Sequence, residues 1–231
     1  MMNLKKIINA VLPPACLGCR SRLLSHEHYF CTSCMAQWTP ANIHGTVSDN
    51  ELARLFWGFF PIDGAAAVYS YIPGTSIGTL LHTMKYGNKA DLCRMMGRQM
   101  AANDAVIELL QPVEVLIPVP LTPKRQHMRG YNQAEEMCRG IAEVTGLEVC
   151  NDVLERVRFA DSQTAMSREE RLENIRGAFR LADGTKVSGK HIAVVDDIIT
   201  TGATVSECLL MLRDVPDLHI SVLSLGWTSS Y

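Results

Sequence analysis

Apolar runs that suit buried strands alternate with helical patterns along most of the chain. Three short, largely apolar runs are typical of strands buried on both faces, at 65–71, 113–119 and 192–195. Apolar residues recur at helical spacing in three longer stretches, at 76–85, 91–110 and 132–144. Strands that alternate with helices predict an α/β fold with a mostly parallel sheet. Open sheets of this kind bind ligands beyond the carboxyl ends of their strands.

Other segments end or interrupt these predicted strands and helices. Two prolines in the stretch after Val119 prevent the second strand from continuing as sheet. Gly146 stops the last of the three helices. Two shorter strands, at 153–157 and 178–181, flank a polar excursion, in which Ser167-x-x-Glu170 fits the start of a small helix.

Residues 190–212, KHIAVVDDIITTGATVSECLLML, carry the most informative chemistry of the chain. The strand-like run ends in two adjacent carboxylates, Asp196 and Asp197, and hydroxyl residues with Gly202 follow where a helical period begins. Backbone N–H groups and the positive end of a helix can cradle a phosphate at such a turn. The two carboxylates can accept hydrogen bonds from a vicinal diol. Phosphate on one side and diol on the other describe a ribose 5-phosphate.

This segment resembles the 5-phosphoribosyl-1-pyrophosphate (PRPP) loop of the type I phosphoribosyltransferases. In that loop an apolar pair, an acidic pair and two further residues precede Thr-Thr-Gly-x-Thr. An ordinary strand, turn and capped helix is the alternative, because single motifs produce false positives. Here the acidic pair, the hydroxyl spacing and the strand context agree over eleven residues, which favours the phosphoribosyl site.

Four of the eight cysteines form two tight pairs near the start of the chain, Cys16-x-x-Cys19 and Cys31-x-x-Cys34. Paired turns of this kind present four thiolates to one tetrahedral ion, which predicts a closed structural Zn²⁺ site. The alternatives are disulfides, which a cytosolic chain disfavours, an iron–sulfur cluster or a redox pair. Two histidines between the pairs are better explained as solvated loop residues. The remaining cysteines share no spacing and are expected to be buried free thiols.

Composition suits one ordinary α/β domain with a smaller appendage. The 231 residues are 47% apolar and 20% charged, with a net charge of −2. We expect a zinc-binding module at 1–45 and a phosphoribosyltransferase-like domain at 46–231. No stretch is strongly basic, so charge alone does not indicate a nucleic-acid-binding protein.

The first residues imitate an export signal, with two lysines before an apolar stretch. The apolar core is too short, however, and two prolines stand where a small cleavage-site residue belongs. Nothing approaches the length of a membrane span. We therefore expect a cytoplasmic protein with no membrane span.

Further motifs connect the cysteine pairs to the PRPP-like loop. In chain order they are Lys85-Tyr86, Ile117-Pro118-Val119-Pro120, Arg129-Gly130-Tyr131-Asn132-Gln133 and the stretch from Gln163 through Arg171 and Asn174 to Phe179. The whole order resembles the ComF family of competence proteins, whose Gram-negative relatives go by the name GntX. The resemblance implies a type I phosphoribosyltransferase-like fold with a zinc module, and a link to the uptake or use of external DNA. A transferase activity that is inferred from the fold has weaker support than one inferred from the chemistry of a site.

The resemblance also implies a role for each site residue. Asp196 and Asp197 would hold the ribose hydroxyls, directly or through Mg²⁺, and 200–204 would cradle the 5-phosphate. The catalytic residues would be Asp196, Asp197, Arg129, Arg168 and Arg171, the last two in a mobile loop that closes over the diphosphate. The PRPP-binding residues would be Val195, Asp196, Asp197, Ile198, Ile199, Thr200, Thr201, Gly202, Ala203 and Thr204, together with Lys124 and Arg125. For each arginine, a solvated helix face or a surface ion pair is the alternative.

No nucleobase pocket can be recognised, and Lys85 with Tyr86 is the pair best suited to line one. Three functions compete. One is a phosphoribosyltransferase acting on an unidentified base or amine, and another is a sensor of PRPP or nucleotides. The third is a competence factor that binds single-stranded DNA and proteins of the competence machinery, with the fold reused as a scaffold. The residues for DNA binding would be Lys124, Arg125 and Arg129, with Lys5, Lys6, Arg20 and Arg22 in the zinc module.

Overall fold

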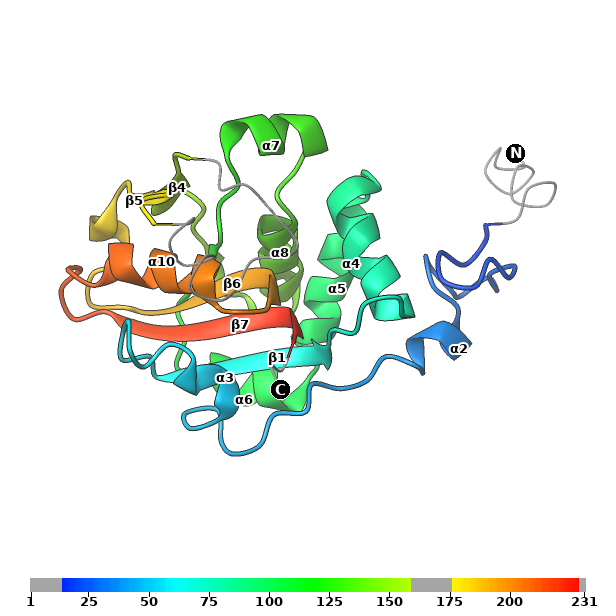
Figure 1. Ribbon diagram of the computed structural model, residues 1–231, viewed down its shortest axis with the longest axis horizontal. Helices are drawn as coiled ribbons and strands as arrows, with labels where there is room; N and C mark the ends of the chain where they lie inside the picture. Colours follow the sequence, from blue (N-terminus) through cyan, green and yellow to red (C-terminus); the bar gives the residue numbers. More distant parts are fainter. Residues whose placement is uncertain (1–13, 159–175, 229–231) are drawn as a thin grey trace.

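A five-stranded parallel sheet forms the centre of the molecule (Figure 1). The computed structural model describes residues 14–158 and 176–228, and every structural statement below concerns these residues. In sheet order the strands are β1 (Gly64–Ser70), β7 (His219–Trp227), β6 (His191–Ile199), β2 (Val115–Pro118) and β3 (Glu148–Val149). All four neighbouring pairs run parallel. The predicted α/β class with a mostly parallel sheet is confirmed.

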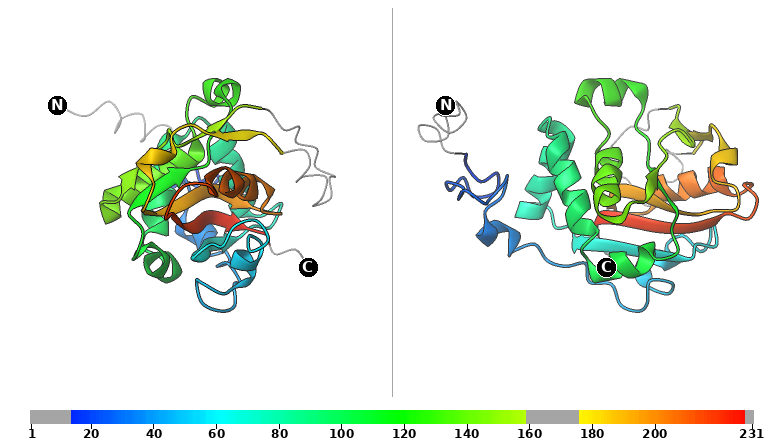
Figure 2. Two further views of the ribbon diagram at one scale, coloured as in Figure 1. Left: turned by 90° about the vertical axis from the view of Figure 1, so that its left-hand side faces the viewer. Right: turned by 180° about the vertical axis from the view of Figure 1, so that it is seen from behind.

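Helices cover both faces of this sheet (Figure 2). One face packs against α4 (Ser76–Tyr86), α5 (Ala90–Met100), α6 (Asp104–Leu110) and α8 (Gln133–Thr145). The other face packs against α3 (Glu51–Arg54) and α10 (Ala203–Leu212). Side chains of β6 alternate between the two, because successive residues of a strand point to opposite faces. Ala193 and Val195 join the first core, and Ile192 and Val194 join the second.

Smaller elements surround this core. They are α2 (Thr32–Met35), α7 (Pro123–Arg129), an antiparallel pair made by β4 (Leu154–Arg156) and β5 (Phe179–Leu181), and the 3₁₀ turn η1 (Gly184–Lys186). The predicted strands at 153–157 and 178–181 correspond to β4 and β5. The small helix predicted after Ser167 lies outside the described residues.

The helix predicted over 91–110 is instead two helices, α5 and α6. The chain turns at residues 101–103, and the side chain of Asn103 accepts a hydrogen bond from the backbone N–H of Val106 at 3.4 Å. An asparagine in this position caps a new helix rather than continuing the previous one. The proline-rich segment after β2 leaves the sheet as expected and then forms α7, which begins at Pro123 and is capped by Thr122.

The four-cysteine module packs against the first helical face. Ser76 Oγ, at the start of α4, donates to the carbonyl of Cys34 at 3.4 Å. A chain of edge-to-face aromatic contacts joins Phe30 to Trp38 at 5.3 Å and Trp38 to Tyr69 of β1 at 5.4 Å. The domain boundary predicted after residue 45 remains a prediction. None of the helices in the described ranges is both long and apolar enough to cross a lipid bilayer.

Candidate functional site

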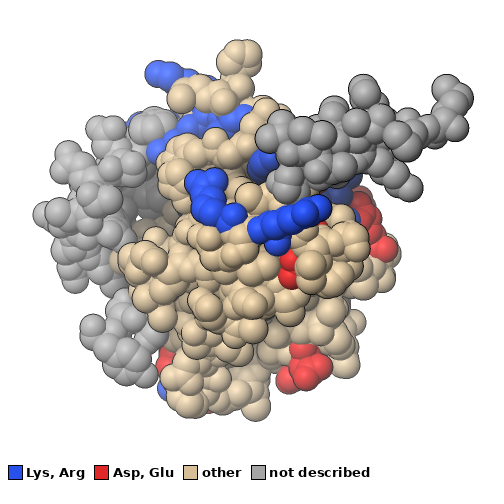
Figure 3. Space-filling view, turned by 90° about the vertical axis from the view of Figure 1, so that its right-hand side faces the viewer, with Lys and Arg blue, Asp and Glu red and all other residues tan. Residues whose placement is uncertain are grey.

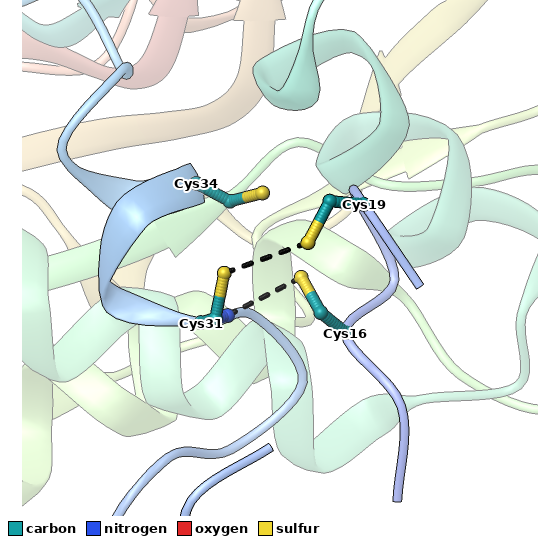
Figure 4. Close-up of side chains that lie close together, drawn as sticks. All are labelled: Cys16, Cys19, Cys31 and Cys34. Carbon is teal, nitrogen blue, oxygen red and sulfur yellow. Dashed lines mark hydrogen bonds between the residues drawn. The ribbon is translucent and has the colours of Figure 1, made fainter. Parts of the chain in front are cut away.

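The four paired cysteines form a cluster that can hold a zinc ion (Figure 4). Their sulfur atoms all lie within 4.8 Å of one another, and the Sγ atoms of Cys19 and Cys31 are 3.7 Å apart. Zinc–sulfur bonds of about 2.3 Å give a tetrahedron with edges of roughly 3.8 Å, so the spacing fits. Hydrogen bonding to Ser21 lowers the pKa of Cys19 to about 6. A thiolate is the form in which cysteine binds metal.

The acidic pair lies inside β6 rather than beyond its end. On one side β6 stays paired with β7 up to Ile199, opposite Trp227. On the other side β2 leaves at Pro118, opposite Val195. The two carboxylates therefore sit where one neighbouring strand has departed and the other continues. Because successive strand residues alternate, Asp196 and Asp197 belong to opposite faces of the sheet.

Asp197 faces the last turn of α4. The Nζ atom of Lys85 lies 3.3 Å from Asp197 Oδ1, and the Asp197 side chain is only 10% exposed. Burial by itself would lower the pKa of Lys85, but the carboxylates of Asp197 and Asp196 raise it above its ordinary value. The lysine therefore stays charged beside the acidic pair. Lys85, which was predicted to line a base pocket, is also the ion-pair partner of Asp197, which was predicted to bind the ribose.

Asp196 lies on the side of α10 and β4. Its carboxylate accepts a hydrogen bond from the backbone N–H of Asp197 at 2.8 Å. Burial, reinforced by the charge of Asp197, raises the pKa of Asp196 to about 7. Near neutral pH this carboxyl group is poised between its protonated and ionised forms, so a bound cation would draw it into the ionised form.

The motif from Arg129 to Gln133 fixes the surroundings of Lys85. The Tyr131 hydroxyl donates to the carbonyl of Met84 at 2.7 Å and accepts from the N–H of Lys89 at 3.0 Å, so it ties together the two ends of the α4–α5 turn. Asn132 donates to the carbonyl of Val119 at 3.0 Å and thereby holds the loop that follows β2. Gly130 has φ +79°, a left-handed conformation that lets α7 turn into α8. Gly130, Tyr131 and Asn132 thus serve as scaffold for the site.

A cleft of about 1140 Å³ opens beside this turn. Its described lining brings together the basic residues predicted for pyrophosphate and the pair predicted for the base, namely Lys85, Tyr86, Lys124, Arg125 and Arg129. No carboxylate is among the described lining residues. Seen from the side of the four-cysteine module, Lys and Arg gather on the upper half of the molecule, toward α7, with Asp and Glu lower or to the side (Figure 3). An anionic ligand suits this cleft.

Two contacts shape the cleft wall. The Arg129 guanidinium carbon lies 5.4 Å from the centre of the Tyr86 ring, and its Nη1 donates to Gln133 Oε1 at 2.7 Å. Burial, with the nearby charge of Arg129, lowers the pKa of Arg125. Both arginines belong to α7, one helical turn apart, and a bound anion would relieve the repulsion between their charges. The Tyr86 side chain is 68% exposed and offers a ring face to solvent.

The segment predicted to cradle the 5-phosphate forms the turn between β6 and α10. Gly202 caps α10 with φ +77°, and a Cβ at this position would come within 3.2 Å of the Phe56 ring. The N–H of Ser206 donates to the Gly202 carbonyl at 2.8 Å, and the N–H groups before Ser206 lie in the opening turn of the helix. This geometry is the one that a phosphate cradle requires. The roles of 195–204 remain predictions.

Arg156 is a site residue that the sequence did not indicate. It lies on β4, with its guanidinium carbon 5.1 Å from the Phe179 ring centre. Its Nε is buried and has no hydrogen-bond partner among the described residues. Burial lowers its pKa, helped by the charge of Arg125, while Asp196 opposes the shift. A lone arginine in a short strand carries no signal in sequence, since only the fold brings it toward Asp196.

Arg168 and Arg171, which were predicted to be catalytic, lie outside the described residues. The residues on either side of the segment that holds them are described. Arg158 Nη2 donates to the carbonyl of Arg176 at 2.5 Å, and the N–H of Gly177 donates to Glu207 of α10 at 2.5 Å. The described residues on either side of this segment therefore lie together, and Gly177 contacts α10.

Solved structures that are similar to this chain include phosphoribosyl enzymes, but their TM-scores are low. Glutamine PRPP amidotransferase from B. subtilis gives a TM-score of 0.37 at 22% identity, covering 58% of this chain and 26% of that one. Hypoxanthine phosphoribosyltransferase from Staphylococcus aureus gives 0.32 at 12% identity, covering 61% and 63%. Likenesses of this size concern the fold alone.

Curated relatives are closer in sequence, although no family model matches the chain. Competence protein F of Haemophilus influenzae is 32% identical over 168 residues, which cover 71% of this chain and 72% of that protein. DNA utilization protein YhgH of Salmonella typhimurium is 30% identical, covering 67% and 68%. Competence protein ComFC of Streptococcus pneumoniae is 33% identical over a region that covers 47% of this chain and 46% of that protein. With these relatives, and with its four-cysteine cluster and parallel sheet, the chain belongs to the ComF family of competence proteins.

Proposed function

We propose that this protein binds PRPP or a nucleoside monophosphate with Mg²⁺, and that it transfers the phosphoribosyl group to a base or amine. The observation that carries the proposal is the placement of Asp196 and Asp197 between a glycine-capped helix start and a basic cleft. Each group of a phosphoribosyl diphosphate has a partner of suitable charge there. We also propose that the four clustered cysteines hold one structural zinc ion.

The residues would divide the ligand between them. The turn before α10 holds the 5-phosphate, the acidic pair holds the ribose hydroxyls, and Lys124, Arg125 and Arg129 hold the diphosphate. Carboxylate oxygens suit Mg²⁺, and the ion supplies positive charge against the diphosphate. As the bond at C1 breaks, positive charge develops on the sugar while the diphosphate leaves toward the basic cleft. Catalysis would be mostly positional and electrostatic.

Ligand-induced stabilisation tests this proposal. PRPP with Mg²⁺ should raise the melting temperature, because a ligand that binds only the folded state stabilises it by mass action. The double variant Asp196→Asn, Asp197→Asn should lose the shift while remaining folded. Asp214→Asn, at a side chain that is 84% exposed, is the matched control and should keep it. An equal shift in the double variant would remove the ribose assignment, and pyrophosphate release with candidate bases and amines would report transfer itself.

Single-stranded DNA is a second candidate ligand. The names of the relatives above refer to competence and DNA utilization. The basic cleft supports this candidate, since it combines cations with the exposed ring of Tyr86 and the exposed side chain of Met128. Single strands bind to positive grooves with aromatic faces on which bases stack. The net charge of −2 argues against a large nucleic-acid surface, so we expect weak binding, measured by fluorescence anisotropy at low salt.

A further inference from the structure

A second group of side chains that could hold a metal ion lies at the amino-terminal ends of the strands, away from the cleft. It consists of Asp63, directly before β1, with His219 and His191, the first residues of β7 and β6. One ligand atom from each of these residues lies within 4.8 Å of the other two. At about 3.3 Å per strand residue, His191 is roughly 16 Å along β6 from Asp196. The cluster is therefore separate from the cleft.

The register of the sheet brings the three side chains together. His191 pairs directly with His219 across β6 and β7, and their ring centres lie 5.7 Å apart. On the other side of β7, the N–H of Asp63 donates to the carbonyl of Ile220 at 2.8 Å. The cluster thus draws one residue from each of three neighbouring strand starts.

The carboxylate is already oriented for a shared ligand. Asp63 Oδ2 accepts a hydrogen bond from the N–H of Ile220 at 2.9 Å, and its Oδ1 lies 3.0 Å from His219 Nδ1. On the other ring, His191 Nε2 lies 2.9 Å from the hydroxyl of Ser221. Such hydrogen bonds fix the orientation of a ligating side chain. The site is also open to solvent, because the side chains of His219 and Asp63 are 64% and 38% exposed.

The charges around the cluster favour a cation. Glu114 accepts a hydrogen bond from the backbone N–H of His191 at 3.1 Å, and Asp217 contributes a further negative charge near His219. Lys190, the nearest basic neighbour in sequence, forms an ion pair with Glu148, with Nζ and Oε2 3.6 Å apart.

We propose that Asp63, His191 and His219 bind a divalent transition metal ion such as Zn²⁺, with the remaining coordination positions open to water. Two imidazoles and one carboxylate are the donor set of open zinc sites and of related transition-metal sites. The bound ion links the starts of β1, β7 and β6, and it stabilises the sheet at the end away from the cleft. A hydrogen-bonded ion pair between Asp63 and His219, without any metal, is the competing account.

Titration of the zinc-loaded full-length protein with Co²⁺ separates the two accounts. We expect one additional equivalent to bind with weak visible absorption and no thiolate-to-cobalt charge-transfer band, which excludes exchange at the cysteines. His219→Ala and Asp63→Asn should each weaken this binding about 10-fold or more, as loss of a ligand does. His219 is exposed, and an asparagine at position 63 can still accept from Ile220, so both variants should fold.

His44→Ala, which removes an exposed histidine outside the cluster, is the control and should bind as the parent does. Added Zn²⁺ should raise the melting temperature of the parent and of this control, but not of the two cluster variants. The proposal is overturned if no metal binds beyond the cysteine site, or if the extra equivalent binds with unchanged affinity to His219→Ala and Asp63→Asn. In either case the cluster is an ion pair only.

Discussion

Lys85 and Asp197 form an ion pair, with Nζ and Oδ1 3.3 Å apart, across 112 residues of chain between α4 and β6. The pair ties the wall of the basic cleft to the acidic residues of the sheet. A ribose hydroxyl that approaches Asp197 therefore meets a carboxylate whose position is already fixed by a cation. Preorganisation of this kind lowers the cost of ordering a site when its ligand arrives.

Removal of the cation should destabilise the protein. Lys85→Met leaves the Asp197 carboxylate largely buried without its partner, and we expect a loss of about 1–3 kcal/mol in the free energy of unfolding. Urea denaturation measures this loss in the free energy of unfolding. Lys124→Met, on a helix that buries no side chain, serves as the control and should change stability by less than about 0.5 kcal/mol. Equal effects of the two substitutions would show that the pair contributes nothing to the fold.

The titration of Asp196 predicts a dependence of stability on pH. Its pKa in the folded protein is about 7, above that of an unfolded aspartate, so the folded state holds an extra proton between these values. Stability should therefore fall as the pH rises from about 4 to 7 and level off above 7. Asp196→Asn should remove this contribution, and the variant should gain at least about 1 kcal/mol on the parent between pH 5 and 7.5. Parallel curves from urea denaturation would contradict the buried titration.

Arg156 should matter more for ligand binding than for folding. Its buried Nε has no hydrogen-bond partner in the described part of the chain, so Arg156→Met removes a polar group without such a partner there and should leave stability unchanged or slightly raised. The same variant should lose part of the melting shift caused by PRPP with Mg²⁺, because one cation facing the acidic side of the site is gone. Arg180→Met, whose side chain is 63% exposed, is the control. A full ligand shift in Arg156→Met would assign the residue to packing against Phe179.

Zinc content checks the cysteine site. After dialysis against a weak chelator, the protein should retain one equivalent of zinc, and the double variant Cys31→Ser, Cys34→Ser should retain none and lose stability. Cys150→Ser replaces a cysteine outside the cluster and should keep its zinc. An iron–sulfur absorption spectrum, or full zinc in the double variant, would overturn the assignment.

The local parts of this architecture could be predicted from sequence, and the contacts between them could not. The β6 run, the cysteine pairs and the cap at Gly146 depend on neighbours a few residues away, so their patterns are visible in the chain. The pairing of Lys85 with Asp197 and the approach of Arg156 to Asp196 depend on how distant strands and helices pack. The extension of β6 to Ile199 likewise depends on β7, a strand that was not predicted.

The basic cleft predicts a distinctive salt dependence for any single-strand binding. Phosphate contacts release counterions, so the logarithm of the affinity should fall linearly with that of the salt concentration, by about 0.7 for each contact on a single strand. Lys124→Glu with Arg125→Glu should flatten this slope, since both residues line the cleft. Arg22→Glu in the four-cysteine module tests the second predicted patch, and Arg213→Glu, exposed after α10, is the control for net charge.

Three outcomes separate the possible roles of the cleft. If the cleft variant and the control lose affinity equally, the attraction is a general charge effect. If the folded, zinc-loaded protein binds no single strand at low salt, the cleft serves only the diphosphate of a small ligand. A slope that changes in the cleft variant alone would mean that DNA and the phosphoribosyl ligand compete for the same cations, and PRPP with Mg²⁺ should then displace the DNA.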